Sequence, residues 1–181
     1  VKWDGAPAVV CGTNPDNGRF FVGTKSVFAQ AAKINYTKKD IATNHGTAEL
    51  GQKLLKCLVH LKKLNIPGVV QGDLLYTDED ITRKNIDGKP HLTFTPNTIT
   101  YAVPEDGDLA KQIDGAKVGI IFHTTYTGDS LATMNAQGGA DVSSFTQSPD
   151  VFFDNASYKD VSGSAKFTAD ESEQFYNSID K

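Results

Sequence analysis

Two short β-prone runs joined by a hairpin signal open the chain and predict the start of an antiparallel sheet. Residues 8–11 and 19–23 are largely apolar, and Asn17-Gly18 lies between them. Asn-Gly is the dipeptide that tight two-residue hairpin turns favour most strongly. Antiparallel pairing places the end of the second strand beside the start of the first. We therefore expect residues 23–26 to lie near residues 2–5.

The rest of the chain alternates short strands with a few helices. One helix is expected over residues 47–65, with Thr47 as its N-cap and leucines recurring at helical spacing. A second face of this helix is basic and would meet either solvent or nucleic acid. The pattern predicts a single α+β domain over residues 1–181. Further strands are expected at 69–76, 92–95, 98–103, 118–123, 151–153 and 157–161, helices at 108–112 and 169–180, and a loop at 136–149.

Composition narrows the class of protein. The chain has 181 residues, 39% of them apolar and 22% charged, with a net charge of −4, as in ordinary soluble domains. No apolar run reaches membrane-spanning length, so we expect no membrane partner and a cytoplasmic setting, including the host cytoplasm if phage-encoded. Cys11 and Cys57 each lie in an apolar run and are expected to be buried free thiols. The sequence opens with Val1 and has its single methionine at Met134, which predicts a fragment.

The segment Val1-Lys2-Trp3-Asp4-Gly5 immediately precedes the first strand. A lysine amine attacks phosphorus only when neutral, so its pKa must be lowered by burial or by neighbouring cations. Asp4 could hold a tight turn, and Gly5 would let a ligand approach the backbone. The alternative is an exposed turn in which Lys2 is merely solvated.

Three later residues could share a site with Lys2. Lys25 follows the second strand and would place another cation nearby, or it is an exposed strand-end lysine. Asp73 lies within the apolar run 69–76, where a carboxylate needs a partner, a ribose hydroxyl or Mg²⁺, unless it is a capped loop residue. Phe122, in the strand 118–123, would stack on a base or belong to the core.

These segments resemble, in order, the motifs of the covalent nucleotidyltransferases, which include DNA ligases, RNA ligases and mRNA capping enzymes. Lys2-Trp3-Asp4-Gly5 resembles motif I, and Thr24-Lys25-Ser26 partly resembles motif Ia of RNA ligases. Gly72-Asp73-Leu74-Leu75 resembles motif III, with aspartate where glutamate is usual. The strand with Phe122 resembles motif IIIa. No match to motif IV or V follows, so the resemblance implies a truncated adenylation-like domain.

The resemblance implies antiparallel sheets flanking a nucleotide cleft, and a chemistry in which Lys2 takes AMP from ATP with Mg²⁺. The AMP would then pass to 5′-phosphate ends of nucleic acid, although little turnover is expected from a chain without motifs IV and V. Lys25 would assist catalysis at the phosphates, and Asp73 would bind ribose or metal. The residues implied in nucleotide binding are Trp3, Asp4, Gly5, Arg19, Asp73 and Phe122. The alternative is a non-catalytic module of phage type that binds a nucleotide or a protein.

Overall fold

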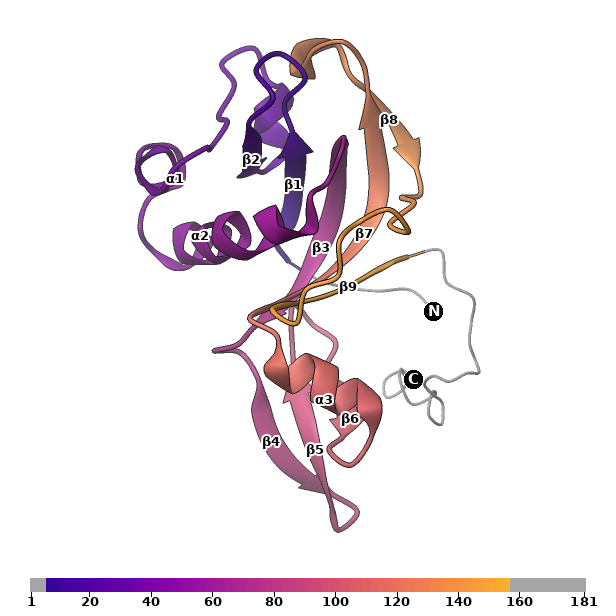
Figure 1. Cartoon of the computed structure of the whole chain (residues 1–181). Coiled ribbons are helices and arrows are strands. Elements are labelled where there is room, and N and C mark those ends of the chain that lie inside the picture. Colours follow the sequence, from indigo (N-terminus) through magenta and orange to yellow (C-terminus); the bar gives the residue numbers. More distant parts are fainter. Residues whose placement is uncertain (1–5, 157–181) are drawn as a thin grey trace.

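The computed structural model describes residues 6–156, which form a mixed α+β fold in two lobes (Figure 1). The α+β class and the predominance of antiparallel pairing are confirmed. Among residues 6–156, no helix is long and apolar enough to cross a membrane. The strands are β1 (Ala8–Thr13), β2 (Phe20–Gly23), β3 (Val69–Thr77), β4 (Thr82–Ile86), β5 (Lys89–Phe94), β6 (Tyr101–Pro104), β7 (Val118–Thr127), β8 (Asn135–Gly138) and β9 (Val151–Asn155). The helices are α1 (Lys38–His45), α2 (Glu49–Leu61) and α3 (Asp108–Gly115), with short 3₁₀ turns η1 (Lys25–Phe28), η2 (Lys62–Leu64) and η3 (Leu131–Thr133).

The larger sheet has the strand order β2-β1-β3-β7-β8, and β9 adds to β7 in parallel (Figure 1). The predicted hairpin forms, with Val10 opposite Gly23 and Thr13 opposite Phe20. β3 then pairs with β1 on one side and with β7 on the other. Segments that are far apart in sequence therefore become neighbours in one sheet.

Helix α2 covers one face of this sheet and forms the main core with it. Leu54, Cys57 and Leu61 of α2 are fully buried against Val9, Cys11, Val70, Leu74 and Phe122 of the strands. The apolar stripe predicted along this helix is largely confirmed, but its first member, Leu50, remains 37% exposed. The predicted N-cap was wrong, because Ala48 occupies that position without a side-chain hydrogen bond.

A second sheet of β4, β5 and β6 forms the other lobe together with α3. Leu92, Phe94 and Tyr101 pack there with Ile113 of α3 and Ile121 of β7. The β4–β5 turn is made by Asp87 and Gly88 at positive φ, as the Asp-Gly pair predicts. β4 itself was not predicted, because all five of its residues are exposed and show no apolar alternation.

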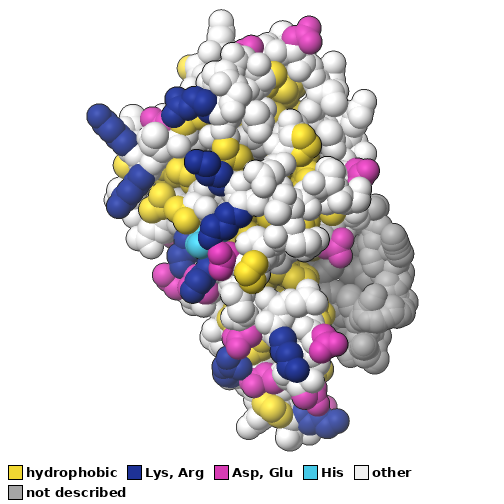
Figure 2. All heavy atoms as spheres, viewed as in Figure 1, with side chains coloured by type: hydrophobic (Ala, Val, Ile, Leu, Met, Phe, Trp, Pro, Cys, Tyr) yellow, Lys and Arg dark blue, Asp and Glu magenta, His cyan; other side chains and the backbone are white. Residues whose placement is uncertain are grey.

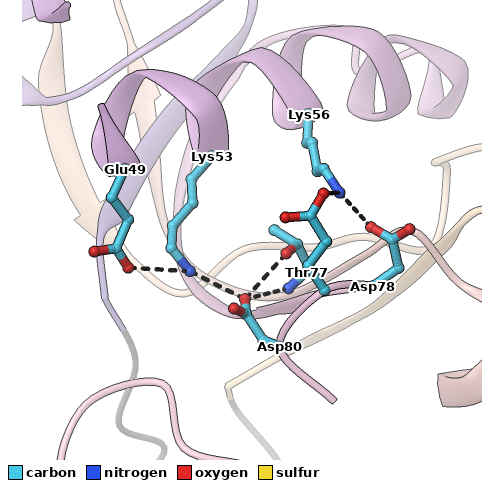
Figure 3. A network of polar contacts seen from close by, with 7 residues as sticks. Glu49, Lys53, Lys56, Thr77, Asp78 and Asp80 are labelled. Atoms are coloured by element: carbon cyan, nitrogen blue, oxygen red, sulfur yellow. Dashed lines mark hydrogen bonds and ion pairs between the residues drawn. The ribbon is translucent and has the colours of Figure 1, made fainter. Parts of the chain in front are cut away.

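The basic face of α2 is engaged in ion pairs with the polypeptide itself. Lys53 binds Asp80 at 3.0 Å, and Lys56 binds Asp78 at 2.5 Å and Glu79 at 3.0 Å (Figure 3). Both lysines thereby join α2 to the turn between β3 and β4, where the lobes meet. Basic and acidic side chains are intermixed with a histidine along this part of the surface (Figure 2). These lysines serve the fold, which argues against this face as a nucleic-acid surface.

Candidate functional site

The segments that the sequence singled out lie on adjacent strands of the larger sheet. Ala8 of β1 pairs with Asp73 of β3, and Asp73 pairs with Ile121 of β7. η1, which contains Lys25, directly follows β2 on the other side of β1. Since neighbouring strands lie about 4.8 Å apart, the whole group spans roughly 15 Å across the sheet.

Asp73 and His123 form the polar centre of the face that α2 does not cover. His123 Nε2 lies 3.2 Å from Asp73 Oδ1, and His123 Nδ1 lies 2.7 Å from Thr124 Oγ1. A carboxylate only accepts, so Nε2–H donates to Asp73, and a neutral ring then accepts the Thr124 hydroxyl at Nδ1. The side chains of Asp73 and His123 are 24% and 31% exposed. A ligand could therefore reach both.

An irregularity in the pairing of β3 and β7 creates this arrangement. Gln71 pairs with Thr124 and Gly72 pairs with Phe122, which leaves His123 as the extra residue on β7. Such a β-bulge re-aims side chains, and bulges are common next to functional sites. Here it lets two consecutive residues, His123 and Thr124, form one hydrogen-bonded chain with Asp73.

Apolar clusters flank this polar stretch on the same face. On one side, Val10, Val27 and Tyr126 belong to a buried cluster, and the Tyr126 hydroxyl donates to Gln71 Oε1 at 2.5 Å. On the other side, Leu75 and Ile121 belong to the core of the second lobe. A half-exposed carboxylate and imidazole between two apolar clusters are unusual for a purely structural surface, and they mark this face as the candidate site.

The 3₁₀ turn η1, which begins at Lys25, packs against the candidate face. Val27 of η1 is buried with Val10 and Tyr126, and the ring of Phe28 lies 4.3 Å from that of Tyr126. Thr24 caps η1 by accepting a hydrogen bond from Ser26 N, and the two hydroxyls lie 2.8 Å apart. Lys25 is exposed, and no acidic side chain within residues 6–156 forms an ion pair with it. Its charge is therefore available to an anion.

Phe122 does not share the site, which corrects the sequence-based expectation. Its side chain is fully buried in the core under α2, edge-on to Phe145 and Phe153 at centroid distances of 5.6 and 6.3 Å. Phe122 pairs with Gly72, whereas Asp73 pairs with Ile121, so Phe122 and Asp73 point to opposite faces. The aromatic ring beside Asp73 is instead that of His123.

Arg19 was also wrongly expected at the site. It directly precedes Phe20, which pairs with Thr13 at the turn end of the hairpin, whereas Asp73 pairs with Ala8 at the opposite end. Five residues of strand correspond to roughly 17 Å. The exposed Arg19 guanidinium instead lies 4.3 Å from the centre of the Tyr36 ring.

Lys2, Trp3, Asp4 and Gly5 lie outside the described residues. The described chain begins at Ala6, and Pro7 O accepts a hydrogen bond from Leu74 N at 3.1 Å. The chain therefore enters the sheet directly beside Asp73.

Asp73 would be the protein's ligand for a cation on this face. Within residues 6–156, no group of three His, Cys, Asp or Glu side chains could hold a metal ion. Mg²⁺ is commonly bound through one or two carboxylates together with substrate phosphates, so Asp73 suits that mode better than a closed metal site.

Comparison with known proteins identifies a family but no activity. A family described as a family of unknown function, DUF6267, matches residues 1–181. The chain belongs to the DUF6267 family. No curated protein and no solved structure matches it.

Proposed function

We propose that this DUF6267 chain binds a nucleoside triphosphate, ATP, on the candidate face and transfers its AMP to Lys2. One observation carries the proposal: the segments resembling motifs III and IIIa are the paired strands β3 and β7, β1 pairs with β3 at Asp73, β2 pairs with β1 and leads into η1 with Lys25, and Asp73 is accessible. A cytoplasmic setting, where ATP is present, suits this reaction.

In the proposed reaction, the neutral Lys2 Nζ attacks the α-phosphorus of ATP. An N–P bond forms, the bond from the α-phosphorus to the bridging oxygen breaks, pyrophosphate leaves, and the amine gives up a proton. Lys25, exposed at the start of η1, would attract the phosphates, and its positive charge would favour the neutral form of a nearby amine. Asp73 would hold the ribose or Mg²⁺, which would neutralise charge developing on the phosphates.

The sheets would flank the nucleotide in the manner of a ligase adenylation domain. Asp73 and His123 lie where the larger sheet turns toward the second lobe, between Tyr126 on one side and Leu75 on the other. The lysyl-AMP would then pass to a 5′-phosphorylated nucleic-acid end, as the resemblance implies.

The test is covalent labelling with ATP carrying a labelled α-phosphate in the presence of Mg²⁺. We expect a labelled protein band that is lost in Lys2→Ala and strongly reduced in Lys25→Ala and Asp73→Asn. Arg19→Ala is the matched control, because it removes a cation of the same hairpin that lies far from Asp73. Labelling that survives Lys2→Ala would refute the proposal.

A second candidate is a module that binds the nucleotide reversibly. It is favoured by the pairing of Asp73 with His123, because the carboxylate already has a partner without metal. The same labelling separates the two functions. Saturable ATP binding without any adduct, at full occupancy and with Mg²⁺ present, supports the binding module over the transferase.

A further inference from the structure

An open hollow of about 320 Å³ lies between the two lobes, beside Leu75 of β3. Its volume falls within the range of ligand pockets, about 300–1,000 Å³. Leu75, two residues after Asp73 on β3, contributes one wall, and Pro7 of the entering chain contributes another. The hollow therefore begins two residues from Asp73 along β3, where α2 and the second lobe meet, and its lining does not include Asp73 or His123.

The walls of the hollow are mostly apolar. Leu50 of α2 and Pro96 of the β5–β6 loop line it together with Pro7 and Leu75. Leu50 is 37% exposed, although it begins the apolar stripe of α2. An exposed leucine at the rim of a concave surface is suited to contact a flat apolar group, such as the face of a heteroaromatic ring.

Asp80 and Lys53 line one edge of the hollow. Asp80 Oδ2 accepts hydrogen bonds from Thr77 N at 2.8 Å, Thr77 Oγ1 at 3.1 Å and Lys53 Nζ at 3.0 Å (Figure 3). All three donors converge on the same oxygen. Within residues 6–156, Asp80 Oδ1 has no hydrogen-bond donor and remains able to accept one from a ligand.

We infer that this hollow holds the base of the nucleotide, with Asp80 accepting a hydrogen bond from the exocyclic amino group of adenine. The inference rests on the proposed function for the nature of the ligand. The order along β3 fits a nucleotide: the base contacts Leu75 in the hollow, the ribose lies at Asp73, and the phosphates extend toward Lys25.

The first test fills the hollow and measures reversible binding. We compare AMP binding by calorimetry to the wild-type chain, to Leu50→Trp and to Val59→Trp. Val59 is the matched control, because it is also exposed, at 51%, and lies on the same helix outside the hollow. We expect Leu50→Trp to raise the Kd at least ten-fold and Val59→Trp to leave it unchanged. An unchanged Kd in Leu50→Trp overturns the inference.

The second test changes the hydrogen-bonding group first on the nucleotide and then on the protein. Inosine nucleotides carry a carbonyl where adenine carries the amino group, so IMP should bind at least ten-fold more weakly than AMP to the wild type. Asp80→Asn can keep an acceptor for Thr77 while presenting an amide donor to that carbonyl, and it should reverse the preference. Equal binding of AMP and IMP to the wild type overturns the Asp80 contact.

The two proposals fail in different ways. A lysyl-AMP adduct together with normal AMP binding in Leu50→Trp would retain the transferase and reject the base site. Loss of AMP binding in Leu50→Trp without any adduct in the wild type would retain the base site and reject the covalent chemistry. No AMP or ATP binding to the wild type would reject both.

Discussion

Replacing Phe122 by leucine should weaken the fold and leave nucleotide binding intact. The phenyl ring is fully buried and contacts Phe145 and Phe153 edge-on. Each aromatic pair contributes about 0.5–1.5 kcal/mol beyond the area it buries, so losing both costs about 1–3 kcal/mol. Domains are typically stable by about 5–15 kcal/mol, so the variant should still fold.

We would monitor urea unfolding by circular dichroism and measure AMP binding on the same samples. Ile86→Ala is the control, because Ile86 is 38% exposed at the end of β4 and its loss should cost less than about 0.5 kcal/mol. A base stacked on Phe122 would predict the opposite result. Unchanged unfolding together with a Kd raised ten-fold or more would refute the assignment of Phe122 to the core.

Three further predictions concern the frame around the site. Burial raises the pKa of the Cys11 thiol, and that of Cys57 to about 12, so neither thiol should react with iodoacetamide until urea unfolds the chain; rapid labelling of the native protein would contradict this. Burial opposes ionisation of Asp80, but the hydrogen bonds from Thr77 and Lys53 outweigh burial and lower the pKa of Asp80 below the ordinary 3.8. The ionised Asp80 therefore stabilises the fold above pH 3.8, and this stabilisation is lost as the pH falls through the lower pKa of the folded state. Asp80→Asn should therefore flatten the acid limb of Tm against pH, and an unaltered limb would count against this. Gly72→Ala would place a methyl group 2.6 Å from Ile121 O in the β7 backbone and should cost about 1–3 kcal/mol, which thermal unfolding would detect; a Tm equal to wild type would mean that the strands are less closely apposed.

Sequence patterns predicted most of the helices and strands because these elements depend on local chemistry. Asp87-Gly88 forms a tight turn, and Thr37 with Asp40 forms both arms of a capping box at the start of α1. The hairpin around Asn17-Gly18 also forms, but it is closed by the longer loop 14–19, in which Gly18 has positive φ and Asn17 does not. β8 was missed because Asn135–Gly138 is exposed and lacks apolar alternation, so it looks like the loop expected there. The parallel pairing of β9 with β7 depends on contacts between distant segments.

The site was only partly predictable for a related reason. Alternation along a strand predicts that Phe122 and His123 point to opposite faces of the sheet, but it does not show which of the two lies on the same face as Asp73. The register of β3 against β7 decides this, and the bulge at His123 alters it. Arg19 was misplaced although antiparallel pairing puts residues 23–26, and not residue 19, beside the start of the first strand, where Ala8 pairs with Asp73.

Backbone amide chemical shifts, recorded as ATP and Mg²⁺ are added to the isotopically labelled chain, test the central claim most directly. The account predicts that the largest changes cluster at Lys25, Asp73, His123 and Thr124, with further changes at Leu75 and Asp80. Changes confined to other surfaces, such as the hollow between α3 and β9, would contradict it, as would the absence of any change at saturating nucleotide.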